Sequence, residues 1–342
     1  MKLLYPGSFN PFHNGHYDIL SQMRRLVDIE NAYIGVAVNA DKSKSDIDIP
    51  WTIRPLMPFP DRVVEIEGLT AQFVKEHDFD AVVRSMRNHI DFEYEKSMAA
   101  WNERIGGVQT IFLPCRSDQY LSSSALREIM PHGNIDQEIT SFMPHIVYER
   151  YKTKKPMGII ITGPIGSGKS TIVKNMHLMT GMASSQGVHE LSQLVGHKVC
   201  DEVMNMAVDK EGVPVKILDL DNAMRQHVTN ADRDAILSSF RNMDDDLYAN
   251  TLTSISNKVN GWEKMFPEGA VIEASALGSY MEYDLIPEDL VARFLVIELD
   301  PPEERIIKNL TQRYGSEDNA RKIYGQRKHF YSSPSVVDYL VQ

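Results

Sequence analysis

The sequence predicts an α/β protein with two domains, each built on a doubly wound parallel sheet. Its 342 residues leave room for two domains of ordinary size, each able to bury its own core. Short apolar runs alternate with stretches of helical periodicity, which is the rhythm of β-α-β units. An apolar run followed by a glycine-containing loop and a helical stretch occurs twice, near the N-terminus and again after Pro156.

The first half of the chain predicts a continuous β-α-β succession. An apolar run at its start passes through a loop into a periodic stretch, and the alternation continues to about residue 130. The strands expected are 2–5, 32–38, 63–66, 81–84 and 110–113, and the helices expected are 16–27, 70–77, 91–105 and 123–130.

A charged segment separates the two halves. Residues 148–156 contain few apolar side chains and end at a proline, which is typical of a short linker, so we expect domains at 1–152 and 153–342. The apolar spacing of 172–214 is compatible with two helices and leaves their role open. The later elements expected are strands at 157–162, 215–220, 270–273 and 293–299 and a closing helical stretch at 302–328.

Composition excludes several classes of protein. Apolar residues at 42% and charged residues at 24% are ordinary globular values. The formal net charge is −11, and both halves are acidic, so we expect no nucleic-acid partner. There is no run of 18 apolar residues and no long apolar stretch at the start, so we expect no membrane segment. Cys115 and Cys200 lie far apart, which fits a reducing, cytoplasmic setting.

The most informative stretch of the first half is residues 7–16, where the first strand passes into the first helix. His13 and His16 are three apart, so both imidazoles can face the ligand that binds over the helix N-terminus. Free N–H donors there suit an anion such as a triphosphate, and Gly15 lets it approach the backbone. Two histidines alone could equally be a helix cap or a metal-binding pair.

Four segments of the sequence carry a family resemblance. Residues 7–16 resemble the His-x-Gly-His element of the nucleotidyltransferase superfamily. Together with 84–87, 91–95 and 122–124, they are similar to bacterial phosphopantetheine adenylyltransferases, over roughly residues 3–145. The resemblance implies a Rossmann-like nucleotidyltransferase domain that transfers the adenylyl group of ATP to 4′-phosphopantetheine, giving dephospho-coenzyme A and pyrophosphate. The first histidine of the turn is commoner in nicotinamide-mononucleotide adenylyltransferases, which remain an alternative.

The same resemblance implies roles for individual residues. His16 would stabilise the α-phosphate of ATP beside His13, Ser8 would position the nucleophile, and Arg87 with the serine turn would bind the departing pyrophosphate. Lys42 and Arg84 would hold the acceptor phosphate, Glu95 would lie near the nucleotide, and Asn102 would contact the pantetheine arm. The nucleotide-binding residues implied are Gly7, Ser8, Phe9, His13, Gly15, His16, Arg87, Glu95, Ser122, Ser123 and Ser124, and the substrate-binding residues are Ser8, Lys42, Leu69, Thr70, Arg84 and Asn102.

The second half opens with a complete Walker pattern, Gly163-x-x-x-x-Gly168-Lys169-Ser170, between a strand and a helical run. Its backbone N–H groups can surround phosphate oxygens, Lys169 can reach the β- and γ-phosphates, and Ser170 can offer its hydroxyl to Mg²⁺. We therefore expect ATP as co-substrate and Mg²⁺ as cofactor. The nucleotide-binding residues expected are Gly163, Gly166, Ser167, Gly168, Lys169, Ser170 and Thr171.

Acidic residues at 219–221 point to the acceptor side of this second site. A carboxylate at the end of a parallel strand can deprotonate an acceptor hydroxyl and bind Mg²⁺, although Asp219 alone could be a helix cap. Residues 217–228 resemble the Asp-x-Asp-x-x-x-Arg element of dephospho-coenzyme A kinases, and 271–280 and 294–327 are similar to later parts of that family. The resemblance implies a P-loop kinase domain with Asp221 as base and Mg²⁺ ligand, Arg225 as substrate contact, Arg313 on a lid and Arg327 beside the adenine. Arg313 could instead belong to a solvated basic helix face.

Together the two halves predict a bifunctional enzyme of coenzyme A synthesis. A fused nicotinamide-mononucleotide adenylyltransferase and ribosylnicotinamide kinase, or a non-catalytic nucleotide sensor, are the alternatives. The expected partners are the small molecules ATP, 4′-phosphopantetheine and dephospho-coenzyme A, and assembly into a homo-oligomer stays open. The catalytic residues expected are His16, Lys42, Arg87, Lys169 and Asp221, with Ser170 and Asp221 as Mg²⁺ ligands.

Overall fold

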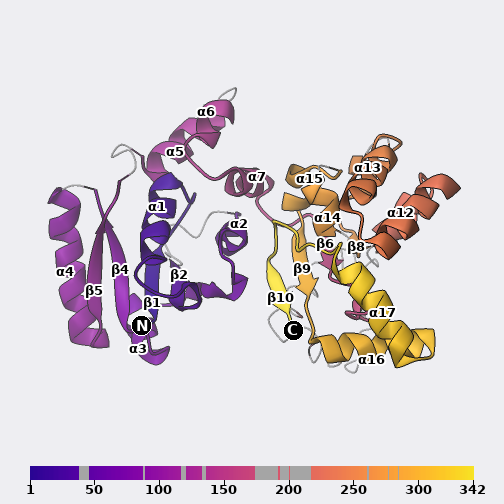
Figure 1. Cartoon of the computed structure of the whole chain (residues 1–342). Coiled ribbons are helices and arrows are strands. Elements are labelled where there is room, and N and C mark those ends of the chain that lie inside the picture. The colour runs from indigo at the N-terminus through magenta and orange to yellow at the C-terminus, as the bar shows by residue number, and fades with distance from the viewer. Residues whose placement is uncertain are drawn as a thin grey trace, which may run out of the picture. The chain divides into compact units, whose positions relative to one another are not determined.

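The chain consists of two compact units, Met1–Lys155 and Pro156–Gln342 (Figure 1). The structure is a computed structural model. It describes residues 1–37, 46–87, 89–116, 121–132, 136–173, 192, 200, 217–259, 262–275, 277–283 and 285–342.

The first unit contains a five-stranded parallel sheet with the strand order β3-β2-β1-β4-β5. This order reverses direction beside β1, which places the ends of β1 and β4 at the topological switch point where α/β sheets bind ligands. The strands are β1 (Leu3–Gly7), β2 (Ala32–Ala37), β3 (Val63–Ile66), β4 (Ala81–Met86) and β5 (Gln109–Pro114). The helices are α1 (Asn14–Met23), α2 (Ile49–Ile53), α3 (Thr70–Glu76), α4 (His89–Gly106), α5 (Ser123–Ile129), α6 (Asp136–Thr140) and α7 (His145–Thr153).

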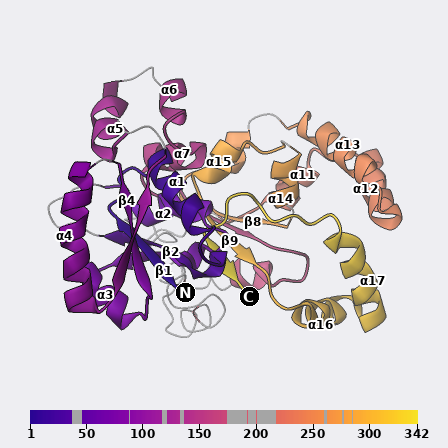
Figure 2. The same ribbon diagram turned by 60° about the vertical axis from the view of Figure 1, so that its left-hand side comes forward.

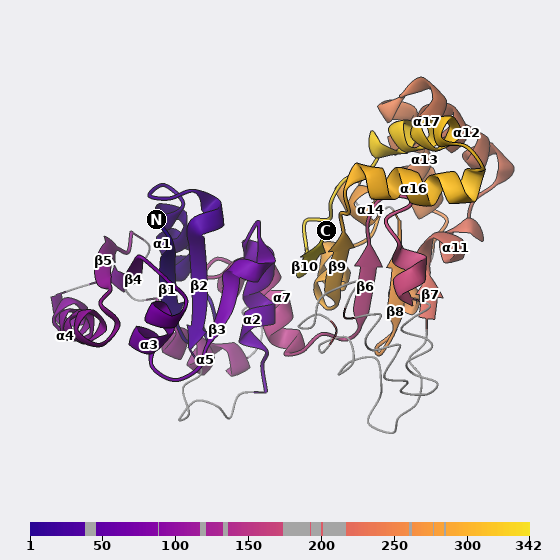
Figure 3. The same ribbon diagram turned by 90° about the horizontal axis from the view of Figure 1, so that it is seen from below.

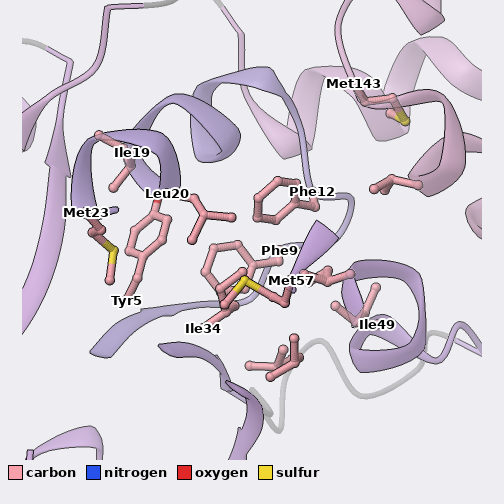
Figure 4. Close-up of a cluster of buried hydrophobic side chains, with 14 of the residues drawn as sticks. Tyr5, Phe9, Phe12, Ile19, Leu20, Met23, Ile34, Ile49, Met57 and Met143 are labelled. Atoms are coloured by element: carbon pink, nitrogen blue, oxygen red, sulfur yellow. The ribbon is translucent and has the colours of Figure 1, made fainter. Parts of the chain in front are cut away.

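Alternating strand residues divide the core of the first unit into two layers. Leu3 and Tyr5 of β1 face one layer, with α1, α2, α5 and α7, whereas Leu4 faces the other, which includes Val74 of α3. Figure 4 shows the larger layer, in which the rings of Tyr5 and Phe9 lie edge to face at 5.2 Å. The loop that follows β1 is therefore anchored in the core by its own aromatic side chains.

The segment expected as a linker is largely helical. Helix α7 covers 145–153 and buries Tyr148 and Arg150 in the first unit. The Arg150 guanidinium lies 4.6 Å from the Trp51 ring and donates to the Trp51 carbonyl, at 2.5 Å. The linker interpretation was wrong for these residues because charge was taken to mean exposure, whereas Arg150 finds a ring and a carbonyl in the interior.

The second unit repeats the doubly wound plan with the strand order β10-β9-β6-β8-β7, again parallel throughout (Figure 3). The predicted α/β fold class with two parallel sheets is thereby confirmed. The strands are β6 (Ile159–Thr162), β7 (Ile217–Asp219), β8 (Val271–Ala274), β9 (Leu295–Leu299) and β10 (Tyr339–Val341). The helices are α11 (Leu220–Arg225), α12 (Asn230–Asn242), α13 (Asp245–Ser256), α14 (Leu277–Glu282), α15 (Glu288–Ala292), α16 (Glu303–Tyr314) and α17 (Glu317–Lys328).

Two helix pairs complete the second unit. Helices α12 and α13 lie side by side, as do α16 and α17 (Figure 2). The closing stretch predicted as one helix is broken at Gly315, which ends α16 in a left-handed conformation, and strand β10 was not predicted. Most of 172–214 lies outside the described residues, so its two helices stay a prediction. Among the described helices, none combines the length and apolar content that crossing a membrane requires.

We expect Leu20→Ala to destabilise the first unit by about 2–5 kcal/mol, because Leu20 is fully buried and its truncation leaves a cavity. Leu26→Ala is the matched control, since Leu26 is 49% exposed and its loss should cost less than about 1 kcal/mol. Urea denaturation of the full chain measures both, and equal losses would contradict the assigned core.

Candidate functional sites

The first site begins at the carboxyl end of β1, where the chain turns into α1. A Cβ on Gly7 would lie 2.8 Å from the Phe9 ring, so only glycine lets that ring fold back over the strand end. Phe9 is buried and adopts φ +45°. The chain then enters α1, and His13 and His16 lie at the N-terminus of that helix.

Two histidines form the N-terminal cap of α1. The His13 Nδ1 atom accepts a hydrogen bond from the Gly15 N–H at 3.1 Å, and the His13 N–H donates to His16 Nδ1 at 3.2 Å. The two rings are stacked with centroids 3.7 Å apart. Because each Nδ1 is an acceptor, the proton of each neutral ring is on Nε2. Each ring therefore has one remaining N–H to donate.

Burial keeps both rings neutral. It lowers the pKa of His13 to about 4, and the nearby Arg87 cation adds to the effect. For His16, burial again lowers the pKa, with His13 and Arg87 contributing, to well below the usual value of a histidine. At pH 7 the pair consequently offers two fixed N–H donors and no positive charge.

A cavity of about 230 Å³ brings together most of the residues predicted to bind the nucleotide in the first unit. Ser122 caps α5 by accepting from the Ala125 N–H at 3.1 Å, and Ser123 donates to the Pro11 carbonyl at 3.0 Å. The serine turn therefore faces the loop after β1, in a position to share an anion with α1. The lining residues are Ser8, His13, Gly15, His16, Ser85, Arg87, Cys115, Ser122, Ser123, Ser124 and Arg127.

Arg127 lines this cavity but was not among the expected residues. Its guanidinium donates to the Asn10 carbonyl and, at 3.0 Å, to the Ser124 hydroxyl. It thereby connects the serine turn to the loop after β1. The signal in the sequence was its position one helical turn after Ser123 and Ser124.

Arg84 lies in a different arrangement from the one expected. Its Nε and Nη2 atoms donate to the two carboxylate oxygens of Glu95 at 2.5 and 2.6 Å, and Nη1 donates to the Pro6 carbonyl at 2.9 Å. Neither residue lines the cavity, and the two form an ion pair between β4 and α4. Among the other expected residues, Leu69, Thr70 and Asn102 also lie away from the cavity, and Lys42 lies outside the described residues.

The second site is the loop between β6 and the helical residues that follow it. Gly163, Gly166 and Gly168 adopt φ values of +143°, +83° and +104°, which side chains other than glycine rarely tolerate. A Cβ on Gly163 would also lie 2.4 Å from the Leu299 carbonyl oxygen. A phosphate-binding loop requires glycines with such backbone angles, and phosphate binding at this loop stays a prediction.

Lys169 is buried inside that loop. Its Nζ donates to the carbonyls of Gly163 at 2.7 Å and Pro164 at 2.9 Å. Burial lowers its pKa to about 8, with Arg313 contributing, while the carboxylates of Asp221 and Glu273 act in the opposite direction. The ammonium is consequently charged at pH 7 and already positioned at the loop.

Ser170 at the end of the Walker loop, Asp221 just after β7 and Glu273 near the end of β8 carry side-chain oxygen atoms. Ser170 donates to Glu273 at 2.6 Å, while Asp221 accepts from the Ser275 N–H at 3.0 Å and from the Tyr280 hydroxyl at 3.3 Å. Mg²⁺ prefers oxygen ligands of this kind, and its binding here stays a prediction. Glu273 was missing from the expected set, although a carboxylate at a strand end beside the Walker loop is the same signal that identified Asp221.

Asp219 serves as the cap of α11 by accepting from the Asn222 N–H at 2.8 Å. A cavity of about 930 Å³ is lined by the Walker loop, by these acids and by residues of α12, α13, α16 and α17. It brings together most of the expected second-site residues, while Gly163 and Ser167 contribute to the loop behind it. The expected residues in its lining are Gly166, Gly168, Lys169, Ser170, Thr171, Asp221, Arg225, Arg313 and Arg327.

The sheet order and the histidine turn of the first unit define a nucleotidyltransferase, and residues 4–129 match the cytidylyltransferase-like family. The phosphopantetheine adenylyltransferase of Actinobacillus succinogenes is 38% identical over 143 residues, which cover 40% of this chain and 87% of that relative. The enzyme of the same name from Thermobifida fusca is 32% identical over 158 residues, covering 45% and 93%. The chain therefore belongs, through its first unit, to the phosphopantetheine adenylyltransferase family.

Comparison of structures gives only weak likenesses. Shikimate kinase from Acinetobacter baumannii in complex with shikimate is 17% identical, with a TM-score of 0.28 over 57% of this chain and 87% of that one. The NadR protein in complex with NR is 14% identical, with a TM-score of 0.31 over 95% of this chain and 84% of that one. At these scores neither likeness carries an argument about activity.

We expect the first unit to lose stability as pH falls from about 6.5 to 4. His13 has a lowered pKa in the folded chain, so the unfolded chain binds the extra proton in this range. This difference in the pKa of His13 corresponds to about 3 kcal/mol in the free energy of unfolding, which is present at pH 7 and should be lost on acidification. His13→Asn is the control, because asparagine also caps helices but does not titrate. Identical pH profiles of the free energy of unfolding would show that His13 is not the group responsible.

Proposed function

We propose that this chain synthesises coenzyme A from 4′-phosphopantetheine in two ATP-dependent steps, one in each unit. The observation that carries the first step is the neutral histidine pair at the α1 N-terminus, in a unit whose relatives are phosphopantetheine adenylyltransferases. The second step rests on the Walker loop with Asp221 beside it and on the sequence resemblance to dephospho-coenzyme A kinases. In this proposal the product of the first site is the acceptor at the second.

In the first step a phosphate oxygen of 4′-phosphopantetheine attacks the α-phosphorus of ATP. A new P–O bond forms, the bond to the β-phosphate oxygen breaks, and pyrophosphate leaves. No covalent intermediate is needed, so catalysis consists of alignment and of donors that match charge on the transferring phosphoryl group. The Nε2–H groups of His16 and His13 supply such donors, and Arg87 with Ser122–Ser124 binds the leaving pyrophosphate.

Other residues of the first unit act on the acceptor in this proposal. Ser8 orients the attacking phosphate at the end of β1, and Lys42 contributes positive charge. Arg84 has its guanidinium donors directed to Glu95 and Pro6, so we assign it the positioning of β4 relative to β1 and α4. That assignment replaces direct binding of the acceptor phosphate.

In the second step the ribose 3′-hydroxyl oxygen of dephospho-coenzyme A attacks the γ-phosphorus of ATP, the bond from that phosphorus to the β–γ bridging oxygen breaks, and ADP leaves. Asp221 accepts the hydroxyl proton, while Ser275 and Tyr280 fix the orientation of its carboxylate. Lys169, the loop N–H groups and Arg313 bind the phosphates, and Arg327 lies on the adenine side. Bound Mg²⁺, held by Ser170 and Asp221 with Glu273 beside them, would neutralise charge on the β- and γ-phosphates.

Product analysis tests the proposal directly. Purified chain receives Mg²⁺-ATP with either 4′-phosphopantetheine or nicotinamide mononucleotide, and products are identified by mass spectrometry. We expect dephospho-coenzyme A and then coenzyme A from the first acceptor. Formation of a dinucleotide only from nicotinamide mononucleotide would instead support the alternative in NAD synthesis.

Two substitutions should separate the activities. We expect His16→Ala to slow adenylyl transfer about 100- to 1,000-fold, the usual effect of removing one preorganised donor, and to leave phosphorylation of dephospho-coenzyme A unchanged. We expect Lys169→Ala to slow phosphorylation of dephospho-coenzyme A and to leave adenylyl transfer unchanged. His77→Ala and Lys264→Ala, both at exposed positions, are the matched controls. Loss of both activities in either site variant would contradict two independent sites.

A further inference from the structure

Two arginines that line the larger cavity have not been assigned a part in binding the nucleotide. Five cationic side chains line it: Lys169, Arg225, Arg233, Arg313 and Arg327. Lys169 belongs to the Walker loop, and Arg313 follows on α16, whose Asn309 donates to the loop carbonyl of Gly166 at 2.9 Å. The Arg327 guanidinium lies 5.1 Å from the Phe240 ring. The pair that remains is Arg225, at the end of α11, and Arg233, in the first turn of α12.

Two carboxylates close to these arginines in the sequence, Asp221 and Asp232, are engaged with other groups. Asp221 lies one helical turn before Arg225, yet its two oxygens accept from the Ser275 N–H and the Tyr280 hydroxyl. Asp232 precedes Arg233 directly. Its Oδ2 accepts from Lys258 Nζ at 2.6 Å and from the Thr229 hydroxyl at 2.6 Å. Within the described ranges, neither guanidinium forms an ion pair with a carboxylate.

The surroundings of the two arginines leave room for an anionic ligand. Much of the remaining lining is apolar or aromatic. The three carboxylates in the lining accept hydrogen bonds from other groups: Asp219 from the Asn222 N–H, Asp221 from Ser275 and Tyr280, and Glu273 from Ser170. Two unpaired guanidinium groups beside an apolar wall gain most from a ligand with two adjacent negative charges, which each can bind through paired N–H donors. The wall residues are Met224, Val228, Ile236, Leu237, Phe240, Tyr248, Leu252 and Ile255.

We infer that Arg225 and Arg233 bind the diphosphate of the acceptor, while its uncharged remainder lies against the apolar wall. This inference rests on the proposed kinase function and deepens it. The two arginines act as specificity-determining residues. They select a ribose hydroxyl whose nucleoside carries a diphosphate over the same hydroxyl on a bare nucleoside.

Steady-state kinetics with two acceptors test this assignment. Dephospho-coenzyme A carries the diphosphate, and adenosine presents the same ribose hydroxyl without it. We expect Arg233→Gln and Arg225→Gln each to raise KM for dephospho-coenzyme A about 10- to 100-fold, the usual effect of losing a charged hydrogen bond. The KM for ATP should stay unchanged, and the preference for dephospho-coenzyme A over adenosine should fall by the same factor. Arg233→Lys should restore part of the loss because it keeps the charge.

Arg241→Gln is the matched control, since Arg241 is exposed on α12 and does not line the cavity. An unchanged KM for dephospho-coenzyme A in both site variants, with wild-type turnover intact, would overturn the inference alone. A raised KM for ATP would also overturn it, because the arginines would then serve the nucleotide. Absence of dephospho-coenzyme A phosphorylation by the wild-type chain would instead refute the proposed function and the inference with it.

Discussion

Both sites depend on one physical constraint, the sharp turn from a central parallel strand into a helix at the carboxyl edge of its sheet. In the first unit this is the turn after β1, where His13 and His16 form the cap of α1. In the second it is the glycine loop after β6. Both strands lie at the centre of their sheets, where strand order reverses and side chains from neighbouring strand ends converge. The remaining features of each site adjust this shared arrangement to a different reaction.

The two turns treat charge differently. Burial keeps the first pair of imidazoles neutral, so that turn offers fixed donors and takes its positive charge from Arg87. The second turn buries an ammonium, and the nearby acids oppose the lowering of its pKa by burial. A net charge of −11 is therefore compatible with the two phosphate sites that we propose, because a few cations inside the cavities would neutralise the negative charge of the ligands.

The sequence predicted those parts of the sites that are local in the chain. Residues 7–16 and 163–170 each fix their own turn through glycines and helix caps, so spacing together with family resemblance was sufficient to predict these turns. It did not predict that Arg84 pairs with Glu95 or that Ser170 binds Glu273, which lies 103 positions away. Those contacts depend on how strands are ordered in the sheet. The prediction of a linker at 148–156 was wrong for a similar reason. The burial of Arg150 depends on its contact with Trp51, which is distant in the sequence.

The two turns predict two nucleotide sites in one chain. Equilibrium dialysis with a non-hydrolysable ATP analogue and Mg²⁺ measures the number of nucleotides bound per chain at saturation. We predict two per chain, with separate affinities for the two turns. Saturation at one nucleotide per chain would contradict the account, because one of the two turns would then not bind ATP.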